Sequence, residues 1–240
     1  MSTPFDAESY GKKPFDGSRM PFRVRAVLLG LNLTLIGAVL LTSLPFYVLI
    51  LYVAGVMAYD EVPRIQYHGI AEYLGYFNIQ RPSWKDGITI VVTIVVLYAT
   101  LFLIGSVATS AGAPEPTNHA IQGDSLSNPL VVGLYVAAFF LFVAPFEEFL
   151  FRHKLQKDWL GKFNVVVRLL SASAFFAVLH YPVYGLSPGG TFSVAVIFVN
   201  ALFFGAAYEL TDNLTVPVIV HATFNSVSVL AIFLLSAGIV

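Results

Sequence analysis

The stretch "VAPFEEFLFRHKLQ", residues Val143 to Gln156, places two adjacent glutamates at the end of an apolar segment. The run from Pro129 to Phe146 contains no charged residue at all. A charged side chain at the centre of a bilayer costs at least about 2.5–3.5 kcal/mol, so two acids at this place need a physical reason. Glu147 and Glu148 are followed by Arg152, and the spacing of these three residues is the starting point for both fold and function.

The composition of the chain is that of an integral membrane protein. Of the 240 residues, 57% are hydrophobic and 11% are charged, whereas soluble domains carry about 25% charged residues. The formal net charge of −1 gives no sign of a nucleic-acid partner. Because the sequence has no cysteine, disulfides, thiolate metal sites and a cysteine nucleophile are excluded.

The hydrophobic pattern predicts an all-α fold, a polytopic bundle of transmembrane helices. A span needs about 20 mostly apolar residues. Five segments reach or approach that length: Gly87–Ser110, Leu130–Phe151, Val165–His180, Thr191–Tyr208 and Val216–Ile239. Residues 26–59 are too many for one span and few for two, and Pro45 near their middle would kink or break a helix. We expect two short helices hinged near Leu44–Pro45, and hence about seven spans, with one long tilted helix as the alternative. Residues 1–25 are predicted to be a tail, and residues 26–240 a single membrane domain.

The basic residues predict how the chain is oriented. All 13 Lys and Arg residues fall into Lys12–Arg25, Arg64–Lys85 and Arg152–Arg168. Cytoplasmic loops are enriched in Lys and Arg, so these three clusters and the N-terminus are expected on the cytoplasmic side. The loops Ala111–Pro129 and Tyr181–Gly190 contain neither residue and are expected on the opposite side.

A small set of polar side chains falls inside or at the ends of the apolar segments, and such groups are functional candidates by default. The set is Glu147, Glu148, Arg152, His180, His221 and Asn225. Glu148 and Arg152 are spaced i, i+4, which permits an ion pair on one helix face, and His221 and Asn225 have the same spacing. Glu147 then points about 100° away from Glu148, towards the bundle interior. The alternative is structural: two acids in water at a helix end, and histidines that serve only in packing or helix–helix hydrogen bonds.

These side chains could converge in the bundle core in two chemically useful ways. A glutamate and a histidine can activate water as a general base, and a second histidine with an asparagine can donate hydrogen bonds to an oxyanion. Alternatively Glu147, His180 and His221 could hold Zn²⁺, because catalytic zinc favours three protein ligands and a water. Both arrangements predict hydrolysis of an acyl bond. The sequence contains neither an HExxH zinc motif nor a GxSxG nucleophile motif.

Three short motifs, each on its own apolar segment, resemble those of the CPBP family of intramembrane proteases. The family is also called Abi or type II CAAX prenyl endopeptidase-like. The motifs read "EEFLFR" from Glu147 to Arg152, "FAVLH" from Phe176 to His180 and "HATFN" from His221 to Asn225. Together with an interfacial stretch before the first of them, the similarity covers about Tyr73 to Ser226.

The resemblance implies a hydrolase and a role for each motif residue. Glu147 would be the catalytic carboxylate and His180 its partner in activating water. His221 and Asn225 would stabilise the tetrahedral oxyanion. The Glu148–Arg152 pair would orient the site and balance its charge.

The resemblance also implies the partners of the protein. The substrate would be a membrane-anchored or lipidated peptide or protein, met within the lipid bilayer and without nucleic acid. No cofactor is favoured, because the amide of Asn225 and an ion-paired Glu148 suit oxyanion binding better than zinc ligation, but zinc remains an alternative. A non-catalytic membrane immunity or binding protein and a proton-coupled transporter are the competing functions.

Overall fold

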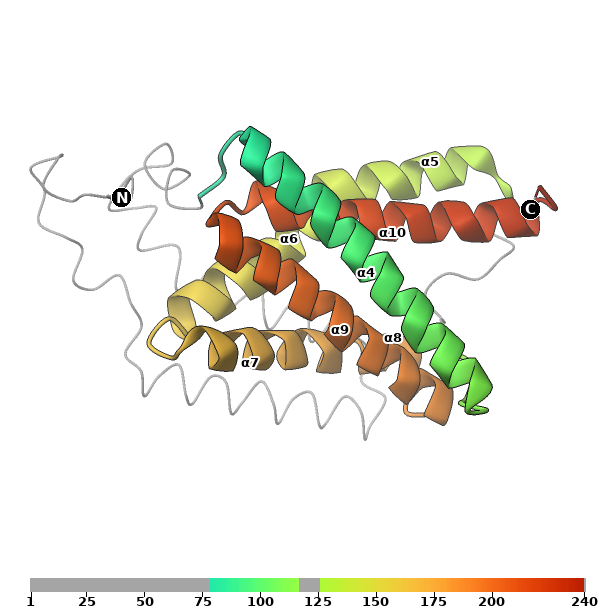
Figure 1. Ribbon diagram of the computed structural model, residues 1–240. Coiled ribbons are helices and arrows are strands. Elements are labelled where there is room, and N and C mark those ends of the chain that lie inside the picture. The colour runs from blue at the N-terminus through green and yellow to red at the C-terminus, as the bar shows by residue number, and fades with distance from the viewer. Residues whose placement is uncertain (1–77, 117–125, 240) are drawn as a thin grey trace, which may run out of the picture. The chain divides into compact units, whose positions relative to one another are not determined.

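The computed structural model describes residues 78–116 and 126–239. Within these ranges all regular elements are helices, in agreement with the predicted all-α fold (Figure 1). Five helical segments there are long and apolar enough to cross a membrane: Trp84–Ser110, Pro129–Trp159, Val165–Tyr184, Pro188–Thr211 and Thr215–Ser236. The predicted total of about seven spans is not confirmed, because residues 26–59 lie outside the described residues. The predicted tail and its cytoplasmic side also fall outside them.

Helix α4, Trp84–Ser110, starts earlier than the hydrophobic pattern predicts. The Ser83 hydroxyl accepts a hydrogen bond from the Asp86 N–H at 3.2 Å, and the Asp86 carboxylate accepts one from the Ser83 N–H at 2.8 Å. This reciprocal capping satisfies N–H groups that a helix start leaves without a partner. The polar residues before Gly87 are therefore the first turn of the span.

The segment with the two glutamates is one continuous helical stretch whose hydrogen-bond pattern changes along its length. It consists of α5 (Pro129–Ala138), a π-helical part η3 (Phe139–Val143), α6 (Ala144–Glu148) and a second π-helical part η4 (Phe149–Trp159). Proline lacks an N–H and clashes with the carbonyl one turn earlier. The helix is nevertheless not broken at Pro145, and the wider π-helical turns on either side of α6 accommodate it. Figure 1 shows that the chain changes direction between α5 and η4.

Helices α7 and α9 begin at polar caps. The side chain of Asn164 accepts from the Val167 N–H before α7, Val165–Val178. Ser187 caps α9, Pro188–Thr211, in the same way. The short α8, Tyr181–Tyr184, connects α7 to α9, and α10, Thr215–Ser236, is the last helix.

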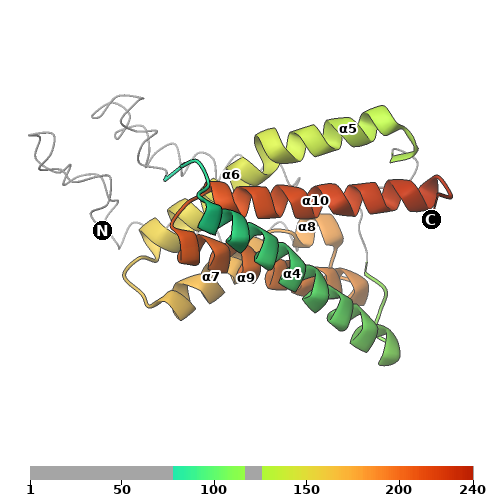
Figure 2. The same ribbon diagram turned by 45° about the horizontal axis from the view of Figure 1, so that its top comes forward.

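The three motif-bearing segments are held together by α9, which carries no motif residue. Helices α7 and α9 lie side by side, and α10 contacts α4, α5, α6 and α9 (Figures 1 and 2). One buried cluster, built around Leu97, Phe204 and Val220, joins α4, α9 and α10. A second cluster joins α5, η3 and α6 to α10. This packing brings the ends of the motif segments towards one another.

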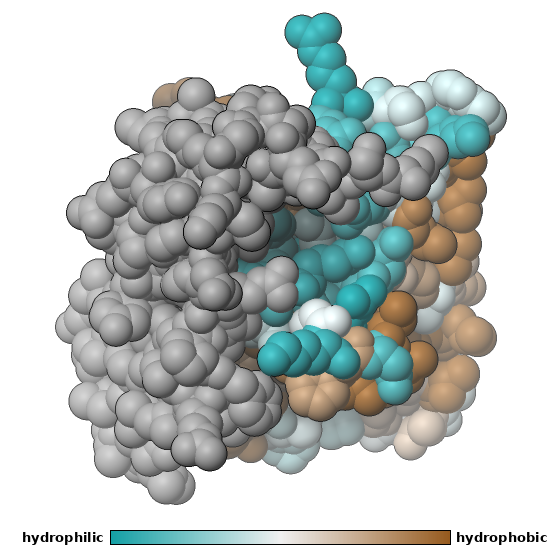
Figure 3. Space-filling model, turned by 90° about the vertical axis from the view of Figure 1, so that its left-hand side faces the viewer, coloured by the Kyte–Doolittle hydropathy of each residue, from teal (hydrophilic) through white to brown (hydrophobic). Residues whose placement is uncertain are grey.

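The outer surface of α4 is strongly apolar. Four large side chains along it, Ile88, Val91, Val95 and Phe102, are each more than half exposed. In a soluble protein an exposed patch of this kind would mark a contact surface, whereas hydrocarbon is a suitable solvent for it. On the face drawn in Figure 3, hydrophilic surface likewise stands beside a flank of hydrophobic residues.

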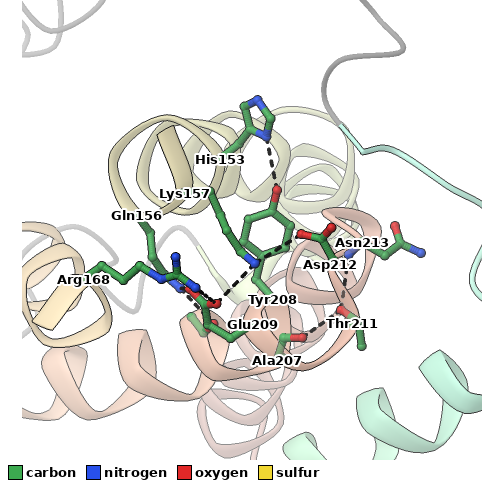
Figure 4. A network of polar contacts seen from close by, with 11 residues as sticks. His153, Gln156, Lys157, Arg168, Ala207, Tyr208, Glu209, Thr211, Asp212 and Asn213 are labelled. Atoms are coloured by element: carbon green, nitrogen blue, oxygen red, sulfur yellow. Dashed lines mark hydrogen bonds and ion pairs between the residues drawn. The ribbon is translucent and has the colours of Figure 1, made fainter. Parts of the chain in front are cut away.

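A polar network fastens η4, α7 and α9 to one another at the end of α9 (Figure 4). The carboxylate of Glu209 accepts from Arg168 at 2.5 Å and from Gln156 at 2.8 Å, and it pairs with Lys157 at 3.2 Å. Lys157 also pairs with Asp212 at 3.2 Å. Glu209 of α9 is therefore the common acceptor for donors from η4 and α7.

Replacing Glu209 with alanine is expected to lower the free energy of unfolding by about 1–3 kcal/mol, because Arg168 and Gln156 would lose their shared acceptor. Asp212→Asn is the matched control. Asp212 is 58% exposed and an exposed ion pair contributes about 0–1 kcal/mol. Its backbone has a left-handed φ of 48°, which asparagine tolerates. Unfolding of the purified variants in detergent measures both losses of stability. Equal losses for the two variants would contradict the role of Glu209 as the shared acceptor of the network.

Candidate active site

The buried carboxylate of Glu148 joins two of the motifs. Its Oε2 accepts from Nε of Arg152 at 2.9 Å, and both side chains are fully buried. The i, i+4 ion pair predicted from the sequence is thus confirmed. The other oxygen of Glu148, Oε1, lies 2.8 Å from Nδ1 of His221 on α10. Because a carboxylate accepts hydrogen bonds, Nδ1 is the nitrogen that carries the proton.

Glu147 lies on the other side of the same imidazole. Its Oε2 is 3.7 Å from Nε2 of His221, and its side chain is 26% exposed. This separation is longer than a direct hydrogen bond. The two nitrogens of His221 thus face two different carboxylates, one buried and neutralised by Arg152 and the other reachable from outside the core.

Aromatic rings enclose His221 and connect it to the second motif. The ring of Phe204 stacks on the imidazole, with 4.6 Å between centroids and an angle of 18° between planes. Phe176 meets the same imidazole edge-on at 5.9 Å and contacts the ring of His180 at 4.6 Å. The Arg152 guanidinium also lies over the Phe176 ring, 5.4 Å from its centroid. Phe176 is therefore the side chain shared by all three motif segments.

His180 is half-buried where α7 ends. Its Nδ1 lies 2.7 Å from the backbone carbonyl of Phe176. A carbonyl oxygen can only accept, so Nδ1 carries the proton, and in the neutral ring Nε2 has a free lone pair. His180 is thus held by the first residue of its own motif with one nitrogen available as a base.

The structure brings some predicted site residues into direct contact and leaves others as neighbours. Glu147, Glu148, Arg152 and His221 form one connected array. His180 joins this array through the Phe176 ring. Asn225 is half-buried on α10, one helical turn after His221 as predicted.

The three residues named above as possible zinc ligands are not assembled into a metal site. In the part of the chain that the structure describes, no three His, Asp or Glu side chains stand close enough together to hold a metal ion. Glu147 and His221 are neighbours, but His180 does not complete a set with them. The arrangement of these side chains therefore does not fit a zinc ion bound by all three.

Two aromatic residues near the array could not be found from the sequence. Phe204 stands on α9 among many other apolar residues, and no spacing distinguishes it. Tyr184 follows His180 by one helical turn, with 6.4 Å between their ring centroids. The ionisable Glu209 was missed for another reason, since it follows the last residue of the predicted span.

Comparisons with curated proteins and with solved structures each gave no match. Comparison with protein-family models gave a match to a segment shorter than half of the chain. The segment begins at the start of α5 and ends two residues after Asn225, so it is narrower on its N-terminal side than the similarity described above. Residues 129–227, which contain all three motifs, match the family model described as type II CAAX prenyl endopeptidase Rce1-like, and the family resemblance predicted from the motifs is confirmed over this segment.

Proposed function

We propose that this integral membrane protein is an endopeptidase that hydrolyses a peptide bond of a membrane-associated or lipidated substrate. The family match suggests a CAAX intramembrane protease and favours an enzyme over the carrier and binding-protein alternatives. The observation that supports the proposal best is the array Glu148–His221–Glu147, in which one imidazole stands between two carboxylates inside a membrane-spanning bundle. Such groups are costly in hydrocarbon and need a function that requires them.

In the proposed reaction, Glu147 and His180 activate the attacking water. Glu147 is the acid that remains partly exposed, and among the described residues no cation lies as close to it as Arg152 lies to Glu148. The water gives up its proton to this pair of bases as its oxygen attacks the carbonyl carbon of the scissile bond. The same proton is then delivered to the leaving amine, so that the site returns to its starting state.

His221 and Asn225 stabilise the tetrahedral oxyanion in this proposal. Both stand on α10, spaced so that they project from the same side of the helix. Preorganised donors aimed at a developing negative charge usually contribute the largest single effect in acyl transfer. His221 can donate from Nε2 when both of its nitrogens carry protons, since Nδ1 is already engaged with Glu148.

Glu148 and Arg152 hold His221 rather than react. The Arg152 guanidinium neutralises Glu148 within the core, and the second carboxylate oxygen fixes which imidazole nitrogen is protonated. A hydrogen-bonded buried pair of this kind keeps its geometry while the substrate exchanges. It is the reason why two adjacent glutamates can have different roles.

The test is a cleavage assay with purified protein in lipid vesicles. The substrates are membrane-anchored peptides with and without a prenyl group near the C-terminus, and products are identified by mass spectrometry. We expect cleavage by the wild type and none by Glu147→Ala. Glu115→Ala, which changes an exposed glutamate outside the helices, should cleave at the wild-type rate. Cleavage that persists in Glu147→Ala would overturn the proposed mechanism, and cleavage restricted to prenylated peptides would define the substrate class.

A further inference from the structure

We propose that Phe204 of α9 is a positioning residue that fixes the imidazole of His221 between Glu147 and Glu148. The expected effect of Phe204 on catalysis rests on the proposed function, whereas its effect on the orientation of His221 does not. Phe204 lies on α9, a long helix beside the site that carries no motif residue.

The backbone of α9 approaches η4 and α7 closely next to Phe204. The following residue is Gly205, where a Cβ atom would lie 2.5 Å from Cδ1 of Leu169 and 2.7 Å from Oε1 of Gln156. A larger residue here would force the ends of these two side chains to shift. The Nε2 of Gln156 donates to the Gly205 carbonyl at 3.1 Å and so fastens α9 to η4 at this place. The position of Phe204 relative to the first motif is thereby fixed.

The Phe204 ring covers one face of the His221 ring. The two planes are inclined by only 18° at a centroid distance of 4.6 Å, and Phe204 is 1% exposed. Phe204 also packs in the buried cluster with Leu97 and Val220, so it cannot move away without opening the core. Aromatic pairs at such distances stabilise one another beyond the effect of buried area alone.

The Phe204 and Phe176 rings together limit rotation of the His221 imidazole about its side-chain bonds. Phe176 meets the ring edge-on at 75°, while Phe204 lies almost parallel to it. With both contacts in place, Nδ1 faces Glu148 at 2.8 Å and Nε2 faces Glu147. Without the stacked ring, His221 would lose one of the contacts that orient it and would depend on the hydrogen bond to Glu148 and the edge contact with Phe176.

The test compares Phe204→Leu with the neighbouring Phe203→Leu. Phe203 is partly buried and packs against the same core cluster, so its variant is matched in helix, chemistry and lost volume. We expect the His221 Hε1 resonance to move downfield in Phe204→Leu, because ring-current shielding is lost, and to stay unchanged in Phe203→Leu. Protein labelled in its five histidines, with His221→Gln for assignment, provides this measurement without any substrate.

Kinetics provide the second readout. For Phe204→Leu we expect kcat to fall about 3- to 10-fold with KM unchanged, as the loss of one aromatic pair implies, and Phe204→Tyr, which keeps a ring, to restore most of it. If Phe204→Leu does not fold, Phe204→Met takes its place, because methionine fills irregular gaps. A His221 resonance that shifts equally in the two leucine variants, or in neither, would overturn the proposal. If the wild type cleaves no peptide, the proposed function fails while the resonance still decides the role of Phe204.

Discussion

Glu147→Gln is expected to reduce peptide cleavage about 10²- to 10⁴-fold, the range that general acid–base groups contribute, with no measurable loss of stability. Glutamine has nearly the shape of glutamate but cannot take a proton from water. Glu147 is partly exposed, and its carboxylate lies 3.7 Å from Nε2 of His221, which is longer than a direct hydrogen bond. Neutralising it therefore breaks no close hydrogen bond within the part of the fold that the structure describes. Initial rates in vesicles and thermal unfolding in detergent measure the two effects separately.

Glu148→Gln is the matched comparison, since it makes the same chemical change one residue away. Here the amide would stand in a fully buried position against Arg152 and His221. We expect a loss of stability of about 1–3 kcal/mol, because the guanidinium loses its charged acceptor, together with a loss of activity. Full cleavage by Glu147→Gln, with none by a stably folded Glu148→Gln, would show that the two glutamates have the opposite roles.

The positions of the five spans within the described residues could be predicted from hydrophobicity, but their ends could not. The residues just before Gly87 and Thr191 are polar or helix-breaking, so a hydropathy window places the start of each span too late. The helices nevertheless begin at these residues, because Ser83 and Ser187 cap them. The predicted end at Phe151 is wrong for a related reason. Helical structure continues to Trp159 through a strongly polar sequence, since its charged side chains find partners within the fold. A hydrophobicity scale counts each charge alone and cannot foresee that pairing.

The sequence was enough to predict which residues belong to the candidate site, but only some of the contacts between them. Helical spacing alone was enough to pair Glu148 with Arg152, and the structure confirms that contact. Nothing in the sequence could show that Glu148, rather than Glu147, makes the short contact with His221, because this depends on how α6 and α10 cross. The π-helical turns around Pro145 contribute to that outcome, since they rotate the faces that follow them. Phe204 was equally out of reach, because its importance comes from the approach of α9 and not from its spacing.

Arg152→Met is expected to have the largest effect on stability, a loss of about 3–5 kcal/mol, because removing one partner leaves an uncompensated buried charge on Glu148. Methionine retains much of the side-chain volume, so the loss reports charge and hydrogen bonding more than a cavity. Lys157→Met is the matched control on the same element. Lys157 is 23% exposed where it pairs with Glu209 and Asp212, and Glu209 keeps Gln156 and Arg168 as donors, so removal of Lys157 should cost only about 1 kcal/mol.

The double variant Glu148→Gln/Arg152→Met separates the stability of the pair from its use in the reaction. Removing both charges together avoids an isolated buried ion, and replacing a buried pair by neutral groups is often close to neutral for stability. We therefore expect the double variant to recover most of the stability lost in Arg152→Met. Its activity should remain low, because His221 would face a weaker, uncharged acceptor at Nδ1. A double variant that is both stable and fully active would mean that the buried pair serves neither to orient His221 nor to set the charge of the site.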